Sequence, residues 1–165
     1  MKQYLADLKR IDMNTAQTPE EIPQIFVENW NKRKPDLMVE IFEEDADFIN
    51  VVGLWWTNRK DIFKAHDYGL KNIFPNSTLK IIKLKTKMLS ETSAVVHTQM
   101  SLTGQSPIAG EKGGIRRTVF TFIVHKKDDG IWWAVSAQNT DIVGGVETYI
   151  RTAEGTLKPV DYRGK

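Results

Sequence analysis

The chain has 165 residues, 41% of them hydrophobic and 27% charged, which predicts one globular domain with modest terminal extensions. The 23 basic and 21 acidic side chains leave a net charge of only +2, so we expect no nucleic-acid partner. The sequence has no cysteine, which excludes disulfides, thiolate nucleophiles, thiolate zinc sites and cysteine-held iron–sulfur clusters.

Residues 1–17 form a predicted N-terminal arm, in which Tyr4, Leu5, Leu8 and Ile11 recur at helical spacing. Charged residues interrupt this apolar pattern, so the arm has no signal-peptide core. No stretch elsewhere reaches the ~18 apolar residues of a membrane-spanning helix. We therefore expect a cytoplasmic protein with no membrane partner.

Three helices are predicted to open the main domain, which we place at residues 18–143. The run Thr18-Pro19-Glu20-Glu21 is typical of a helix start, although Pro23 also allows a start one turn later. A shorter helix follows Lys34-Pro35, and Thr57 is the expected N-cap of the third. Each helix carries an apolar stripe, so each is expected to pack on a core.

The rest of the domain has the pattern of a sheet. Two short strands are predicted between the second and third helices, and four long ones follow at 78–89, 94–104, 115–125 and 131–141. Helices followed by long strands favour an α+β fold with a strongly curved antiparallel sheet and a pocket under the helices. Residues 144–165 are polar and weakly patterned, and are predicted to form a C-terminal tail.

One segment carries a family resemblance: Phe48-Ile49-Asn50-Val51-Val52-Gly53-Leu54-Trp55-Trp56, followed by Arg59, Ile62 and His66. It resembles the SnoaL-like superfamily, which shares the nuclear transport factor 2 fold, and within it the SgcJ/EcaC group, named as oxidoreductases. The same pattern continues through Leu102-Thr103-Gly104-Gln105, Arg116-Arg117-Thr118 and Gln138-Asn139-Thr140. The resemblance covers about residues 22–143 and implies a cone-shaped, cystatin-like α+β barrel, usually a homodimer built through the sheet.

The resemblance implies no single activity, because its members include polyketide cyclases, steroid isomerases, dehydratases and proteins that only bind. The sequence has no Gly-x-Gly-x-x-Gly motif, so we expect no nucleotide cofactor. Isomerase-like members use a pocket Asp with a Tyr or a protonated acid. Here Asp47 alternates away from the presumed pocket face, and no tyrosine falls in the four long strands.

Two histidines are candidate catalytic residues. His66 lies on the apolar side of the third helix, either as a core histidine with both nitrogens satisfied or as a pocket-lining donor or base. His97 shares a strand face with Gln99, and this face either lines the cavity or forms the outer, dimer-forming surface. No carboxylate accompanies the histidines at ligand spacing, so we expect no metal site.

The candidate ligand-binding residues are Asn50, Trp55, Trp56, Gln99, Arg117 and Gln138. Asn50 either bonds to neighbouring backbone or orients a polar atom of a ligand. Because adjacent strand residues point to opposite faces, only one member of each adjacent pair enters the pocket.

For the pairs 138–139 and 116–117, alternation alone does not say which residue faces the pocket. Counting Trp132, Ala134, Ser136 and Gln138 as one face places Gln138 inward and leaves Asn139 for the interface. An arginine of the 116–117 pair in the pocket needs a ligand carboxylate, or a protein partner such as Asp47 or Asp141, which we favour.

Three functions agree with these patterns. The first is an enzyme acting on a polyketide-like or other polycyclic carbonyl compound, with His66 or His97 as base. The second is a non-catalytic protein that binds a small, largely apolar molecule in the same pocket. The third is a dimeric interaction module with a vestigial cavity.

Overall fold

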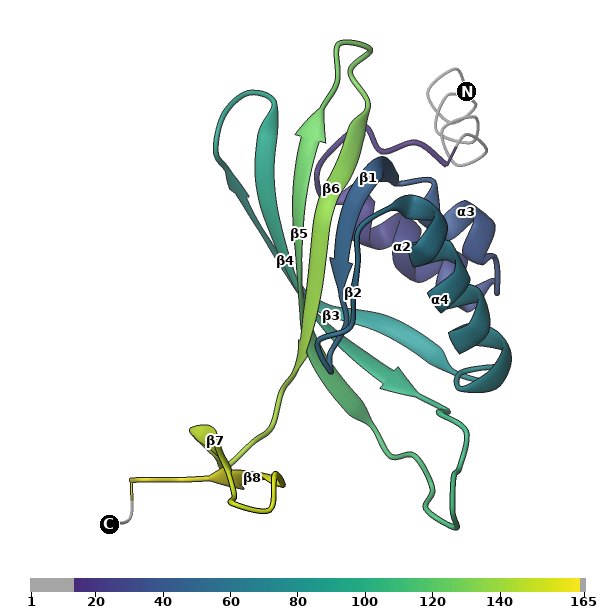
Figure 1. Cartoon of the computed structure of the whole chain (residues 1–165). Coiled ribbons are helices and arrows are strands. Elements are labelled where there is room, and N and C mark those ends of the chain that lie inside the picture. The colour runs from purple at the N-terminus through teal and green to yellow at the C-terminus, as the bar shows by residue number, and fades with distance from the viewer. Residues whose placement is uncertain (1–13, 164–165) are drawn as a thin grey trace.

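The computed structural model describes residues 14–163 (Figure 1). The helices are α2 (Glu21–Asn31), α3 (Pro35–Val39) and α4 (Arg59–Asn72). The strands are β1 (Phe42–Ile49), β2 (Trp55–Trp56), β3 (Thr78–Met88), β4 (Ser93–Thr103), β5 (Arg116–Lys126), β6 (Trp132–Asp141), β7 (Thr148–Arg151) and β8 (Leu157–Val160). Most of the predicted N-terminal arm lies outside the described residues.

The helix starts differ slightly from those predicted. Helix α2 begins at Glu21, so Pro23 lies in its first turn, where a missing N–H costs no intrahelical hydrogen bond. Helix α4 is capped by Asn58 and not by Thr57. The Asn58 Oδ1 atom accepts a hydrogen bond from the backbone N–H of Asp61 at 2.9 Å.

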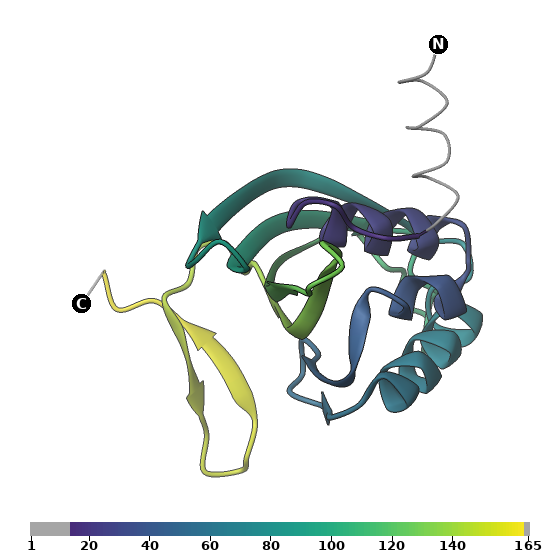
Figure 2. The ribbon, with the colours of Figure 1, turned by 90° about the horizontal axis from the view of Figure 1, so that it is seen from above.

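The predicted α+β class with a curved sheet is confirmed. Six strands form one sheet in the order β2-β1-β6-β5-β4-β3, and the three helices lie on one side of it (Figures 1 and 2). The sheet is mixed and not wholly antiparallel, because β1 pairs in parallel with β6. Strand β1 starts at Phe42, three residues after the end of α3, where Phe42 pairs with Ala134.

The core fills the space between the helices and the inner face of the sheet. Phe26 of α2 is fully buried, and its ring contacts the rings of Phe42, Phe48, Phe120 and Phe122. The predicted apolar stripe of the first helix therefore meets two strands, β1 and β5. Of these rings, Phe48 and Phe120 also line the cavity described below.

Strand β6 contains a bulge that changes which residues face inward. Ser136 pairs with Ile123, whereas Ala134 pairs with Val124, so Val135 has no partner opposite it on β5. Beyond the bulge the inward positions are therefore odd-numbered. Ala137 is 1% exposed and lies on the inner face.

The predicted C-terminal tail contains an antiparallel hairpin, β7–β8, that extends away from the sheet (Figure 1). Its apolar residues are largely exposed, among them Tyr149, Ile150 and Leu157. Within the described part of the chain, no helix is both long and apolar enough to cross a membrane.

Candidate functional site

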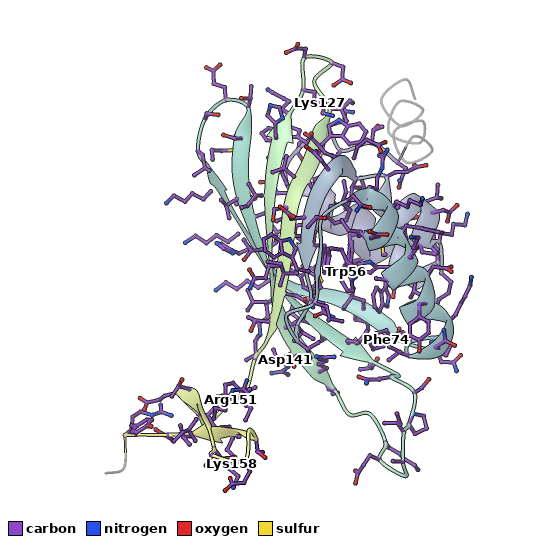
Figure 3. All side chains as sticks on the ribbon, viewed as in Figure 1. Trp56, Phe74, Lys127, Asp141, Arg151 and Lys158 are labelled. Atoms are coloured by element: carbon purple, nitrogen blue, oxygen red, sulfur yellow. The ribbon has the colours of Figure 1, made fainter. Side chains whose placement is uncertain are left out.

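A cavity of about 410 Å³ lies between α4, the end of α2, the β1–β2 turn and the inner face of the sheet. Its walls are mostly aromatic and aliphatic. Figure 3 shows Trp56 and Phe74 on the helix side of the sheet, and Trp30, Phe48 and Phe120 complete the aromatic wall. This size and lining are typical of a site for a small, largely apolar molecule.

His66 lies at the buried end of this cavity and is only 9% exposed. Rings surround its imidazole, with the Phe48 centroid 4.9 Å and the Phe26 centroid 5.7 Å from its own. Burial lowers the pKa of His66 to about 4, so the side chain is neutral at pH 7. Nδ1 lies 2.7 Å from the Ile62 carbonyl oxygen, and no described residue bonds to Nε2.

Asn50 lines the cavity at the β1–β2 turn. Its Oδ1 accepts hydrogen bonds from the backbone N–H groups of Val52 at 3.1 Å and Leu54 at 2.9 Å. No described residue accepts a hydrogen bond from its Nδ2. Asn50 therefore bonds to neighbouring backbone, as one of our alternatives had it, and its side chain, which lines the cavity, keeps a donor with no acceptor among the described residues.

The adjacent pair on β6 is placed opposite to our expectation. Asn139 lines the cavity and Gln138 is exposed on the outer face, because the bulge at Val135 shifts the alternation by one residue. The Asn139 Oδ1 atom is buried without a hydrogen-bond partner among the described residues. Since Ile49 pairs with Gln138, Asn50 and Asn139 follow side by side on neighbouring strands.

Trp55 and Trp56 point to opposite faces of the sheet, as expected for adjacent residues of a strand. Trp56 lines the cavity and is half-buried. Trp55 is 63% exposed and does not line it, and its Nε1 donates to Asp47 Oδ1 at 2.7 Å. Asp47 is thereby held on the side away from the cavity.

The arginine pair also divides. Arg116 reaches the cavity, and its Nε and Nη2 donate to the two carboxylate oxygens of Asp141 at 2.7 and 2.9 Å. Asp141 is thus the protein partner we favoured. Arg117 is exposed and lines a different, open surface depression of about 580 Å³ near Ile142 and Val143.

The structure does not bring His97 or Gln99 to the cavity. His97 is exposed on the outer face of β4, where its Nδ1 lies 2.9 Å from the Thr121 hydroxyl, and Gln99 is half-buried on the same face. Lys85 of the neighbouring strand β3 pairs with His97, and Lys85 is also exposed to solvent.

Sequence reasoning missed several lining residues: Trp30, Tyr68, Phe74 and Asn139. Tyr68 lies two residues after His66 on α4 and is 62% exposed at the cavity mouth. No Asp or Glu among the described residues lines the cavity. In residues 14–163 no three His, Asp or Glu side chains are grouped to hold a metal ion.

Comparison with known proteins identifies the fold and nothing finer. No family model and no curated protein matches the sequence. An uncharacterised protein with a cystatin-like fold from Caulobacter vibrioides is 23% identical, with a TM-score of 0.70 over 76% of this chain and 87% of that one.

Two further structures are similar at lower identity. One, titled "Putative Scytalone Dehydratase", from Novosphingobium aromaticivorans, is 16% identical with a TM-score of 0.66 over 97% of this chain and 98% of that one. A ketosteroid isomerase-like protein from Erwinia carotovora atroseptica is 11% identical, with a TM-score of 0.62 over 75% and 93%. The chain therefore has the cystatin-like fold of proteins similar to nuclear transport factor 2, as expected.

Proposed function

We propose that this protein binds a small, ring-containing and largely apolar molecule in the cavity beneath α4. The observation that carries the proposal is the lining itself: aromatic side chains from helices α2 and α4 and from strands β1, β2 and β5 surround about 410 Å³, together with a few polar groups. Aromatic walls favour flat ligands, which can stack on the faces of the rings or contact their edges.

A pair of variants on α4 tests this proposal. Ala65 lines the cavity, so Ala65→Trp should fill it, whereas the adjacent Lys64 points outward and Lys64→Trp should not. Calorimetric titration with 2-naphthol should show binding to the natural protein and to Lys64→Trp, but none to Ala65→Trp. Equal binding by both variants, or none by the natural protein, contradicts the proposal.

A catalytic function is the second candidate, and His66 is the observation that favours it. Its Nε2 has no partner among the described residues and the ring is neutral, which suits a base that acts on a polyketide-like carbonyl compound, as the resemblance to the SnoaL-like superfamily suggests. Against it, no carboxylate among the described residues lines the cavity. If the natural protein turns over such a compound, and His66→Phe binds it without turnover, the catalytic function is established. If the natural protein binds the compound without turnover, only the binding function stands.

We further propose that the protein is a cytoplasmic homodimer formed through the outer face of the sheet. Ile123 on this face is 41% exposed; Val95, its partner on β4, is half-buried, and so is Val119 on the same face of β5. Sedimentation should give about twice the chain mass of 18.9 kDa. Ile123→Glu should give monomers, whereas Leu89→Glu, at an exposed site beyond β3, should not; a natural protein that sediments as a monomer contradicts the proposal.

A further inference from the structure

Two polar side chains of the cavity have hydrogen-bonding roles that are fixed by backbone groups of the protein. The first is His66. The Ile62 carbonyl oxygen can only accept a hydrogen bond, so the Nδ1 atom 2.7 Å away must carry the proton. A neutral imidazole has one N–H, and Nε2 is therefore an acceptor, with no donor among the described residues. Burial among aromatic rings keeps the imidazole neutral and so maintains this arrangement.

The second is Asn50. Two backbone N–H groups, of Val52 and Leu54, point at one atom of its side chain, and only the carbonyl oxygen can accept from both. This identifies the other atom as the amide nitrogen, which is a donor. The amide cannot rotate to present its oxygen without leaving both N–H groups unpaired.

The two groups lie at different depths. His66 is 9% exposed, whereas the turn that holds Asn50 is at the mouth, since Val52 is 76% and Leu54 57% exposed. The one cationic side chain that reaches the cavity among the described residues is Arg116, and both oxygens of the Asp141 carboxylate pair with it. His66 thus offers an acceptor deep in the cavity and Asn50 a donor at its mouth, and the cavity carries little net charge.

We propose that the ligand is a neutral, ring-containing molecule that enters with a hydroxyl or N–H group toward His66 Nε2 and leaves a carbonyl-type acceptor beside Asn50 Nδ2. This inference rests on the proposed binding function and adds the direction in which the ligand lies. His66 then determines specificity: an ether or carbonyl oxygen at the inner end would face a lone pair and leave Nε2 unsatisfied. An unsatisfied buried acceptor reduces affinity about ten-fold or more.

Three naphthalene compounds test the proposed hydrogen bond to His66 Nε2. The natural protein should bind 2-naphthol at least about ten-fold more tightly than 2-methoxynaphthalene or naphthalene, measured by calorimetric titration. In His66→Phe this preference should disappear. If that variant does not fold, nitrogen NMR of the natural protein replaces it: the Nε2 resonance should be that of an unprotonated nitrogen and should shift with 2-naphthol only.

The Asn50 half has a matched pair of variants. Asn50→Asp keeps an oxygen for the two backbone N–H groups but replaces the donor with a second oxygen. It should lose about ten-fold in affinity for 6-acetyl-2-naphthol and little for 2-naphthol, which has no acceptor at that end. Gln138→Glu makes the same chemical change on the adjacent strand but on the outer face, and should change neither affinity.

The outcomes separate this inference from the proposed function. If all the probes bind and the hydroxyl makes no difference, or if Nε2 is protonated, the assigned direction is overturned while the binding function stands. If Asn50→Asp and Gln138→Glu behave alike toward 6-acetyl-2-naphthol, the donor role of Asn50 is overturned. If none of the probes binds the folded protein, both proposals fail together.

Discussion

The imidazole of His66 and the carbonyl group of Ile62, one helical turn earlier in α4, are joined by a hydrogen bond of 2.7 Å. It determines three properties of the site together. It fixes the tautomer, it holds the ring against Phe48 and Trp56, and it leaves Nε2 toward the cavity. Because the bond lies within one helix, it does not depend on a ligand, so the site is preorganised.

Burial of His66 should make the protein less stable in mild acid. The pKa of His66 is lowered from 6.5 to about 4 in the folded chain, so between these values the unfolded state binds more protons than the folded state. The free energy of unfolding therefore decreases as the pH falls from about 6.5 to about 4, by ~3 kcal/mol at 1.36 kcal/mol per pKa unit. Urea unfolding across this range measures it.

The control for this prediction is His66→Phe, which removes the titrating group but keeps an aromatic ring in contact with its neighbours. Other titrating residues contribute to both proteins, so the difference between the two curves isolates His66. The free energy of unfolding of the natural protein minus that of His66→Phe should be constant above about pH 6.5 and should decrease as the pH falls below it. Parallel curves down to pH 4 would show that His66 titrates normally in the folded chain.

Asn139→Leu should stabilise the protein without ligand. Its Oδ1 is buried with no hydrogen-bond partner in the part of the chain that the structure describes, and leucine has nearly the same shape without a polar group to desolvate. We expect a gain of about 1–2 kcal/mol in the free energy of unfolding. Gln138→Leu, at the exposed neighbouring position, should give no comparable gain. A greater gain at residue 138 would mean that the register of β6 is the one we first expected.

Alternation along strands predicted much of this site from the sequence, and it failed where one strand departs from regular geometry. Asn50 and Trp56 were both among the candidates, and His66 was placed on the correct side of its helix. Gln138 was assigned to the pocket because no residue near Val135 signals a bulge, neither glycine nor proline. A single extra residue then reversed every later position of β6.

Other features depend on contacts between distant parts of the chain. The parallel pairing of β1 with β6 joins strands about ninety residues apart, and no local pattern reports it. Trp30 and Phe74 line the cavity because the ends of α2 and α4 meet there, with their ring centroids 5.3 Å apart. The sequence marked both only as apolar residues of helices that pack on a core.

Removal of the hairpin should leave the stability of the main domain unchanged. The residues of β7 are all exposed, and the described contacts that hold the hairpin are mainly those between β7 and β8. A chain ending at Gly145 should therefore have a thermal unfolding midpoint within about 2 °C of the full chain. Scanning calorimetry measures this. A drop of about 10 °C would show that the hairpin packs on the domain or on a second copy.

Ser77→Ala should weaken both the fold and the aromatic wall of the cavity. The Ser77 hydroxyl accepts from Trp30 Nε1 at 3.0 Å and donates to the backbone carbonyl oxygen of Phe74 at 2.9 Å, and so links the Trp30 ring to the backbone of Phe74. Without it the buried indole N–H has no acceptor, which costs about 1–3 kcal/mol.

The measurements are urea unfolding and titration with 2-naphthol, and Ser101→Ala is the control. Ser101 is half-buried on the outer face of β4, and its loss should cost less than about 0.5 kcal/mol. If the two variants lose equal stability, the Trp30 contact contributes nothing particular. If Ser77→Ala loses stability but binds 2-naphthol as the natural protein does, Trp30 is held in place by packing and the hydrogen bond is not needed for the site.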